Sequence, residues 1–269
     1  MTNPRRFLIT QNSAAAVLNF LFICAISVSS YAKAPLAQSY YLDGQFEDAF
    51  TVYSDLIAVS NNNAPLLYNY ANTCFRLYQK YGPEHKEVWL ARAITAWEKA
   101  KKLSPEDKDI QFNLRYARQF TIDRFEEDNT TNPLTRIVFF FYFMFSANQL
   151  VAGAILFFFL GSLFVVCVLI FKPCRIKIMY SVCIGFFLLW GIFFGSSLYK
   201  QHSESVVQAG IISQKEAAVY TEPSDNSKIA TKIHEGSKVY IRRTEINWIN
   251  IALPNGFTGW IRNGEIFSI

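Results

Sequence analysis

The pattern of apolar and polar positions divides the chain into three regions. Between residues 33 and 124, apolar side chains recur at the spacing of helices that bury one face. The two clearest stripes are Ala49, Tyr53, Leu56 and Ile57, and Leu90, Ala93, Trp97 and Ala100. A break at Gly44 precedes the first stripe, and Pro105 ends the second because proline cannot continue a helix. A third helix is expected from about Asp107, so this region is predicted to be all α.

Two long apolar runs follow the helical region, at residues 148–171 and 178–199. Neither run contains a charged residue, and each is long enough to cross the hydrocarbon core of a bilayer as a helix. Because backbone amides in lipid must be satisfied internally, the runs are predicted to form a hairpin of two transmembrane helices. Residues 125–147 are predicted to be a polar linker and a segment in the membrane interface. Two buried helices of a globular protein are a poor alternative, because the rest of the chain is too small to cover them.

Positive charges set the expected orientation of this hairpin. The loop at residues 172–177 contains Lys172, Arg175 and Lys177, and loops rich in Lys and Arg stay in the cytoplasm. Both flanking regions are then predicted to face outward. Residues 1–32 have a basic start, a short apolar run and small residues at the end, which is typical of a signal peptide; an uncleaved anchor is the alternative. Export by a signal peptide predicts the same topology independently.

Residues 207–269 change to the two-residue period of β-strands. The alternating apolar residues are Val239, Ile241, Ile249, Ile251 and Leu253. Asn255-Gly256 is a strong hairpin signal, and further breaks fall at residues 223–226 and 235–236. Short strands between such breaks predict a small antiparallel barrel. An isolated open hairpin is the alternative, but it would struggle to be stable alone.

Composition supports a membrane protein and excludes some functions. Hydrophobic residues make up 51% of the chain, and its 25 phenylalanines concentrate between Ile137 and Phe194. The net charge is +5, but there is no basic stripe with interleaved aromatic residues, so nucleic-acid binding is not expected. Only Cys74 of the five cysteines lies in an exported domain, which excludes an intradomain disulfide framework. Cys74 is either a redox-sensing thiol or a small apolar filler.

The sequence contains no grouping typical of a catalytic, cofactor or metal site. The three histidines, His85, His202 and His234, have no partner at metal-ligand spacing. A phosphate-binding loop and a Gly-x-Ser-x-Gly elbow are both missing from the sequence. The apolar runs hold no Asp, Glu, Lys, Arg or His, which argues against a proton relay. We therefore expect a binding protein without a cofactor rather than an enzyme.

Residues of the helical region resemble the tetratricopeptide repeat. The second half of one unit is similar to Gly44, Phe46, Ala49, Tyr53 and Leu56. A second unit is similar to Tyr70, Ala71, Ala93, Trp97, Ala100 and Pro105. This second unit is lengthened by an insertion at about residues 81–87, and the third unit has Arg115 where the family has a small residue, as in a capping helix. The alternative is an ordinary helical bundle.

The resemblance to this repeat implies a concave groove that binds extended peptides. The corresponding groove positions are Tyr68, Asn69, Asn72, Arg76, Phe112, Asn113 and Tyr116. Asparagine side chains would hydrogen-bond a peptide backbone there, and Arg76 would meet a carboxylate. Alternatively, Asn69 and Asn113 only support helix packing.

The C-terminal region resembles a bacterial SH3 domain. The similar stretches are Val219 to Ser224, Glu235 to Val239, Trp248, and Gly256 to Ile261. This resemblance implies a small all-β barrel of a family that often binds cell-wall peptides. Tyr220, Trp248 and Trp260 form the candidate ligand surface. The alternative for Trp260 is a place in the core.

A leader, repeat units, two spans and an SH3-like domain, in this order, resemble the BatE-type family of the Bat aerotolerance operon. The resemblance implies a multidomain protein of the bacterial inner membrane, with its N- and C-terminal domains in the periplasm. It implies an adaptor or scaffold for envelope proteins, such as membrane proteins with von Willebrand A domains. The alternative is a module that binds peptidoglycan through the SH3-like domain. A third hypothesis is a thiol sensor at Cys74.

Overall fold

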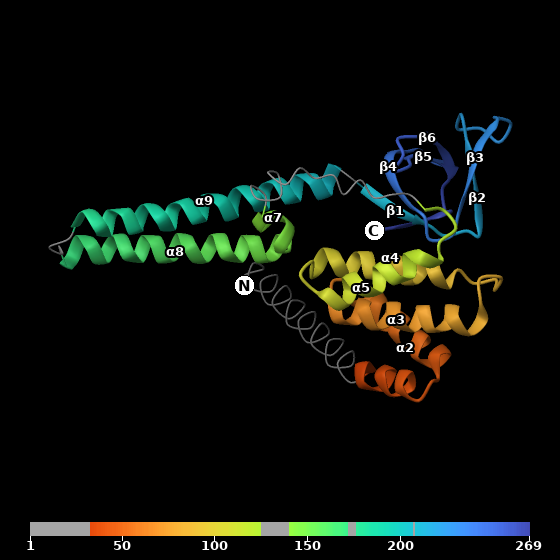
Figure 1. Ribbon diagram of the computed structural model, residues 1–269, viewed down its shortest axis with the longest axis horizontal. Helices are drawn as coiled ribbons and strands as arrows, with labels where there is room; N and C mark the ends of the chain where they lie inside the picture. The colour runs from red at the N-terminus through yellow and green to blue at the C-terminus, as the bar shows by residue number, and fades with distance from the viewer. Residues whose placement is uncertain (1–32, 125–139, 172–175, 207) are drawn as a thin grey trace, which may run out of the picture.

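A helical region and a β-sheet pack against each other in the computed structural model, and a long pair of helices projects from them (Figure 1). The described residues are 33–124, 140–171, 176–206 and 208–269. The prediction of a helical N-terminal region and an antiparallel all-β C-terminal region is confirmed. The expected signal peptide (1–32), most of the linker (125–139) and loop residues 172–175 lie outside the described residues.

Successive helices of the N-terminal region pack side by side. They are residues 33–42, α2 (Phe46–Val59), α3 (Ala64–Tyr81), α4 (Trp89–Leu103), α5 (Lys108–Ala117) and the short 3-10 helix η1 (Arg118–Phe120). Gly44 makes the first turn with a φ of 76°, which glycine adopts without strain. Ala49, Ala71 and Ala93 are fully buried, so neighbouring helices approach closely. The predicted insertion forms the connection between α3 and α4.

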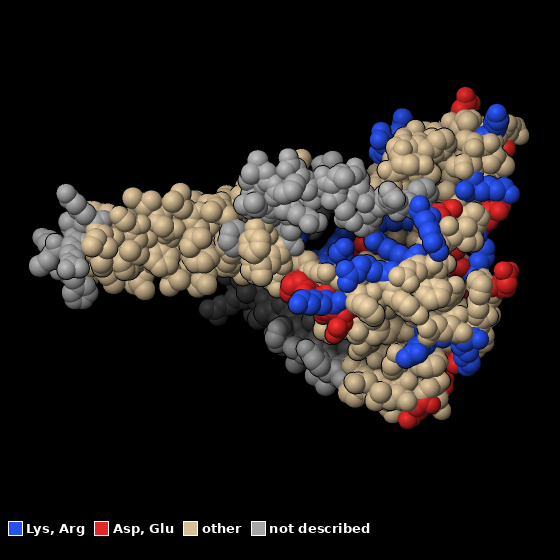
Figure 2. All heavy atoms as spheres, viewed as in Figure 1, with Lys and Arg blue, Asp and Glu red and all other residues tan. Residues whose placement is uncertain are grey.

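The projecting pair consists of two apolar helices. Its elements are α7 (Phe140–Met144), α8 (Ala147–Phe171) and α9 (Ile176–Val206). The stretches Ala147–Ile170 and Ile178–His202 are long and apolar enough to cross a membrane, judged by length and composition. Figure 2 shows the pair as an almost uncharged rod, whereas Lys, Arg, Asp and Glu are spread over the helical region and the sheet.

Helix α9 begins within the predicted loop and ends beyond the predicted span. Of the predicted loop residues 172–177, Ile176 and Lys177 belong to α9, which continues to Val206. The stretch of α9 that is apolar enough to cross a membrane begins at Ile178. No proline or glycine lies between Pro173 and the second apolar run (178–199), so no residue there would prevent a helix from starting before the run. A lysine is a good helix former, so the positive charge of Lys177 does not keep it out of the helix.

Hydrogen bonds fix the open end of this hairpin. The buried Lys200 of α9 donates through Nζ to the carbonyl oxygens of Tyr142 at 3.1 Å and Phe145 at 2.6 Å, and so holds α7. Gln149 near the start of α8 donates through Nε2 to Glu106 Oε1 at 3.0 Å. The hairpin is therefore attached both to α7 and to the loop between α4 and α5.

The C-terminal region is a seven-stranded antiparallel sheet with the order β3-β2-β6-β5-β4-β1-β7. The strands are β1 (Gln208–Ile212), β2 (Glu216–Tyr220), β3 (Ile229–His234), β4 (Lys238–Thr244), β5 (Trp248–Ala252), β6 (Thr258–Arg262) and β7 (Ile266–Ser268). Side chains from β1 to β6 meet in one buried cluster, so the sheet curls around its own core. The predicted turns are present, and Gly236 and Gly256 occupy them with φ of 85°.

Strand β1 joins this core to that of the helices. Side chains alternate across a strand, so neighbouring residues face opposite sides. Ile212 packs into the sheet core, whereas Ile211 packs into the helical core; both are fully buried. Phe267 of β7 packs beside Ile211, and the Arg92 guanidinium of α4 lies 5.6 Å from the centre of its ring. The helices and the sheet thus share an apolar interface.

Three carboxylates form polar contacts across this interface. Glu235, in the turn between β3 and β4, accepts a hydrogen bond through Oε1 from the Ala91 amide at 3.1 Å. That amide lies in the first turn of α4, where backbone N–H groups have no acceptor within the helix. Val88, the residue just before the helix, has no side-chain oxygen that could cap them. Glu235 therefore caps a helix that lies far away in the sequence.

The other two interface carboxylates lie on the helical side. Glu98 of α4 pairs with Arg118, and its Oε2 lies 3.1 Å from Nζ of Lys238 in β4. Asp123 accepts from the His234 amide and from Ser237 Oγ, both at 2.6 Å. We call Glu98, Asp123 and Glu235 the interdomain carboxylates. Each has its partners in the opposite region or in both regions.

Replacing Gly236 with alanine is expected to weaken the docking of the sheet on the helices. A Cβ at this position would lie 2.8 Å from Thr121 Cγ2 and 3.0 Å from Ile94 Cδ1, both across the interface. Gly256→Ala is the matched control, because its φ is also 85° but a Cβ there would meet nothing within 4 Å.

Hydrogen exchange of the Ala91 amide reports this docking directly, because its acceptor is Glu235. We expect Gly236→Ala to accelerate that exchange about 10- to 100-fold relative to Gly256→Ala, since overpacking costs about 1–3 kcal/mol. Equal exchange in the two variants would contradict the interface.

Acid is expected to weaken the docking. Burial raises the pKa of Glu98, but the charges of Lys238 and Arg118 outweigh it and leave that pKa below its ordinary value. The pKa of Asp123 is also lowered, because hydrogen bonds from Ser237 and His234 outweigh its burial. A lowered carboxyl pKa stabilises above the unfolded value of about 4, and this contribution is lost as the pH falls through the folded pKa.

The protection factor of the Ala91 amide should therefore fall as the pH is lowered from about 7 to below 4. Glu98→Gln should lower the protection at neutral pH and flatten its dependence on pH. A variant with the wild-type pH profile would rule out Glu98 as a contributor.

Candidate functional site

A hollow of about 320 Å³ lies between α3 and α5. The residues that line it are Tyr41, Tyr68, Asn72, Phe75, Arg76, Gln79, Trp97, Phe112, Asn113 and Tyr116. Six of the seven predicted groove residues are among them. The α3 members recur three or four residues apart, which brings them to one face of the helix. We call this cavity the α3–α5 hollow.

The seventh predicted residue, Asn69, lies elsewhere. It lines a separate hollow between the first helix, α2 and α3, together with Tyr53 and Asn63. Its side chain interacts with the Tyr53 hydroxyl, whose pKa burial raises. The structure thus separates Asn69 from the other six predicted groove residues, because Asn69 lines the hollow towards the first helix and α2, whereas Asn72 lines the α3–α5 hollow. Its position agrees with the alternative of a packing role.

Aromatic rings form one wall of the α3–α5 hollow. The ring centres of Phe75 and Tyr116 are 5.7 Å apart, and Phe112 and Tyr116 stack with an interplanar angle of 1°. Phe112 is 61% exposed and Tyr116 is 41% exposed. The wall therefore offers an accessible apolar surface.

Amide groups connect the two helices across the hollow. Asn113 donates through Nδ2 to the Tyr68 hydroxyl at 3.2 Å and to Asn72 Oδ1 at 3.1 Å. These bonds hold α5 against α3, so Asn113 has a packing role in any case. They also use the side-chain oxygen of Asn72, whose amide nitrogen has no hydrogen-bond acceptor among the described residues.

Residues outside the predicted groove set add to the chemistry of the site. Tyr41 accepts a hydrogen bond from Arg76 Nε at 3.4 Å, and Gln79 accepts one from Arg76 Nη1 at 3.2 Å. Trp97 lines the hollow from α4, although its place in the apolar stripe predicts only a core residue. Helix α4 lies behind α3, and only the packing of the two reveals this contact.

Cys74 has the environment of an inert thiol. It is fully buried in α3, and burial raises the pKa of its thiol to about 12. The thiolate is the reactive form of cysteine, so such a thiol hardly reacts near neutral pH. This environment favours the apolar-filler interpretation over the sensor.

The three predicted aromatic residues of the sheet lie close together. Tyr220 pairs with Trp260 across β2 and β6, and the Tyr220 and Trp248 rings meet edge to face at 5.1 Å. All three are half-buried, whereas Gly259 and Ile261 on either side of Trp260 are buried. Trp260 therefore lies on the outer face of the sheet rather than in its core.

Two further residues extend this aromatic face. Arg262 lies opposite Trp248 in the register and pairs with Asp225 at 2.8 Å. Ile246, in the turn before β5, is 92% exposed and lines an open hollow of about 710 Å³ with these residues. The turn signal predicts where Ile246 lies but not that it borders Trp248.

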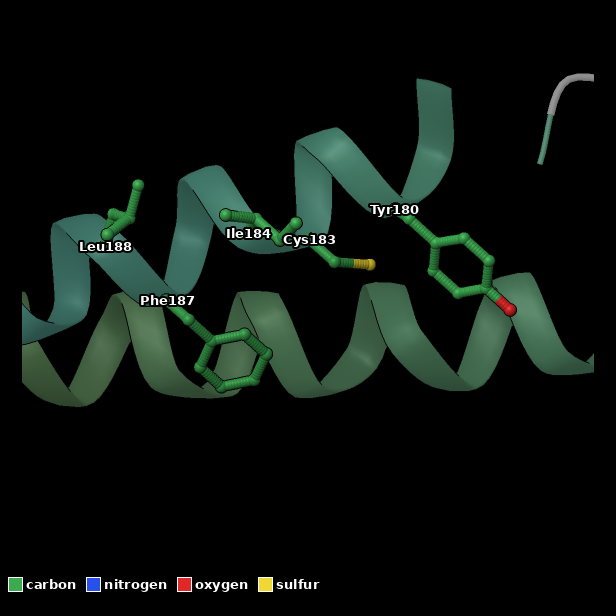
Figure 3. A pocket seen from close by; sticks show the side chains of 5 residues that line it. All are labelled: Tyr180, Cys183, Ile184, Phe187 and Leu188. Carbon is green, nitrogen blue, oxygen red and sulfur yellow. The ribbon is translucent and has the colours of Figure 1, made fainter. Parts of the chain in front are cut away.

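Another hollow lies on the apolar helices. Its lining residues are Tyr180, Cys183, Ile184, Phe187 and Leu188. Figure 3 shows all five on α9, with Phe187 pointing towards α8. The side chains are nearly all apolar, so they offer little for specific recognition and suit contact with lipid. Within the described residues, no group of three or more His, Cys, Asp and Glu could hold a metal ion.

Comparison with known proteins identifies one domain. Residues 213–267 match a family model described as bacterial SH3 domain, which confirms that interpretation of the C-terminal sheet. No curated protein matches the chain. The match begins after β1, so this docking strand lies outside the matched residues, whereas β7 lies mostly within them.

Cys74 is expected to resist alkylation in the folded protein. In a variant with the other four cysteines replaced by serine, reaction with N-ethylmaleimide at pH 8 should be at least about a thousandfold slower than in denaturant, because a thiol with pKa about 12 is almost never ionised. Mass spectrometry measures the rate. Rapid labelling of the folded protein would support a sensor instead.

Proposed function

We propose that this chain is a membrane-anchored adaptor that binds an extended protein segment in the α3–α5 hollow. The convergence of six predicted groove residues on one cavity supports this best. Aromatic walls suit apolar side chains, and amide and guanidinium groups suit a peptide backbone and its charged groups. Such a site recognises a ligand without reacting with it, so the role is binding rather than catalysis.

The packing of the helices favours a tetratricopeptide-type arrangement. Ala71 and Ala93, the small residues of the second unit, are fully buried where α3 and α4 meet. Asp107 caps the third unit by accepting from the Asp109 and Ile110 amides. In this arrangement the first helix, α3 and α5 line the concave side, where repeat proteins of this type bind peptides.

The membrane anchor in this proposal is the pair of α8 and α9. Apolar side chains such as Phe159 and Leu188 are more than 60% exposed, which a bilayer would cover and water would not favour. A hairpin returns the chain to the side it came from, so both flanking regions share one side. The charges of Lys172 and Arg175 favour the periplasmic side of a bacterial inner membrane for both.

The partners in this proposal are other envelope proteins. The order of the regions resembles the BatE-type family, whose suggested partners are membrane proteins with von Willebrand A domains. A role in aerotolerance rests on that resemblance alone.

Peptidoglycan binding through the SH3 domain is the second candidate function. The family match favours it, since bacterial SH3 domains often bind cell-wall peptides. Tyr220, Trp248 and Trp260 provide the candidate contact surface on the outer face of the sheet. This face lies away from β1 and β7, which dock on the helices, so both sites are open at once.

Photo-crosslinking in intact cells distinguishes the two candidates. A photoreactive phenylalanine at Tyr116 should capture an envelope protein, and one at Trp248 should capture cell-wall material, if each proposed site is used. The exposed Asp55 of α2 is the control position, because it lies outside both hollows. Protein adducts no more abundant at Tyr116 than at Asp55 would defeat the adaptor. Cell-wall adducts at Trp248 alone would then favour the second function.

A further inference from the structure

Basic side chains gather around the C-terminal half of α4. Lys101 and Lys102 lie three and four residues after Glu98, so these side chains share one face of the helix. Glu98 pairs with Arg118 and Lys238, and it lies within electrostatic reach of Lys101. Glu98 thus accompanies four basic side chains. We call Lys101, Lys102, Arg118 and Lys238 the α4 basic cluster.

Much of the charge of this cluster has no acid beside it in the described part of the chain. Neither Lys101 nor Lys102 forms an ion pair with a described residue, although Lys102 donates to the backbone oxygen of Ile269 at 3.1 Å. Burial and the charge of Lys102 lower the pKa of the neighbouring Lys99. Like charges therefore crowd the end of α4, and an anionic partner would relieve their repulsion.

The α4 basic cluster lies close to the start of the apolar hairpin. Glu106 follows Lys102 by four residues and accepts the hydrogen bond from Gln149 of α8 at 3.0 Å. Four residues span at most about 14 Å, which limits the distance between the Cα atoms of Lys102 and Glu106. Figure 2 shows Lys and Arg side chains gathered in the recess where the almost uncharged rod meets the helical region and the sheet. This recess lies at the surface of any membrane that the hairpin crosses.

Acidic side chains in the nearby connection between α4 and α5 have local roles. Glu106 is the acceptor for Gln149, and Asp107 accepts from the amides of Asp109 and Ile110 at the start of α5. The Asp109 carboxylate lies in the first turn of α5, where the positive end of the helix dipole stabilises it. The carboxylates of this connection therefore do not neutralise the lysines of α4.

We propose that the α4 basic cluster binds phosphate groups of anionic phospholipids at the surface of the membrane that α8 and α9 cross. Ammonium groups of lysine bind phosphate as point charges, and anionic lipid surfaces attract basic segments beside a membrane-spanning helix. The flexible stems of Lys101 and Lys102 let their ammonium groups extend to the headgroups. This inference rests on the membrane anchor of the proposed function. The contact fixes how the helical region and the SH3 domain stand on the membrane.

A lipid surface suits this position better than an acidic protein. The hydrogen bond between Gln149 and Glu106 couples the cluster to the hairpin, so insertion of the hairpin brings the headgroups to the cluster without a separate encounter. An acidic protein would have to enter the same recess between the hairpin and the two regions. The membrane is therefore the partner with the higher effective concentration.

Native mass spectrometry of the full chain released from lipid nanodiscs tests the proposal. The nanodiscs contain equal amounts of phosphatidylglycerol, which is anionic, and phosphatidylcholine, which has no net charge, with the same acyl chains. The measured quantity is the ratio of the two lipids that stay bound to the chain. Each basic residue near an anionic surface strengthens the attraction about fivefold, so Lys101→Gln/Lys102→Gln should lower this ratio about 10- to 25-fold.

Two variants control for net charge and for packing. Lys86→Gln/Lys228→Gln removes the same charge from two exposed lysines, one before α4 and one before β3, and should keep the wild-type ratio. Lys101→Arg/Lys102→Arg retains the charge of the cluster and should also keep the ratio. The Ala91 amide should exchange at the wild-type rate in every variant, which shows that the SH3 domain is still docked.

The outcomes separate this inference from the proposed function. A ratio that falls equally in Lys101→Gln/Lys102→Gln and in the control pair would overturn the lipid contact at the cluster, as would a ratio that neither pair changes. The hairpin would remain an anchor in both cases. A chain that fails to enter the nanodiscs would overturn the membrane anchor and this inference together.

Discussion

The interdomain carboxylates are shielded from water only because the helical region packs against the sheet. A buried carboxylate is costly unless it is paired and hydrogen-bonded. Glu235 finds its partner 144 residues away, at the amide of Ala91, and Glu98 joins Arg118 of the helical side to Lys238 of the sheet. Together with the apolar contact made by β1, these pairs join two regions that the chain separates by an apolar hairpin. The contact requires both regions to lie on one side of any membrane that the hairpin crosses. A hairpin satisfies this requirement, so packing and topology support each other.

The docking also bears on the candidate site. Phe120 of η1 packs against Phe75 and Tyr116, which form the aromatic wall of the α3–α5 hollow. The chain then runs directly to Asp123, which the turn between β3 and β4 holds. The SH3 domain thus supports the far end of the helical stack. Its own aromatic face, around Trp248, remains on the side away from the helices. The arrangement is one of two open surfaces on one joined body, which suits the proposed adaptor function.

Local sequence patterns predict the helices, strands and turns, whereas the contacts between them depend on the tertiary structure. The helical stripes, the glycine turns and the stretch from Gly256 to Ile261 depend on neighbours in sequence, so they could be predicted directly. The helical docking of β1 could not, because a strand buried on both faces lacks the polar alternation of an outer strand. The repeat pattern assigns Asn69 to the groove side of its helix but does not distinguish the two hollows that this helix borders. Glu235 carries no sequence signal as a helix cap, since its helix is distant. Likewise, Trp97 follows a core pattern and reaches the hollow only through packing.

The central claim is that the helical region and the SH3 domain form one joined body beside the apolar hairpin. A distance measurement between spin labels tests it most directly. The exposed residues Asp55 in α2 and Arg243 in β4 are suitable for labels after replacement by cysteine, with the native cysteines removed. Pulsed electron resonance on the full chain in nanodiscs should give one narrow distance distribution. A broad distribution, like that of two domains on independent tethers, would contradict the account.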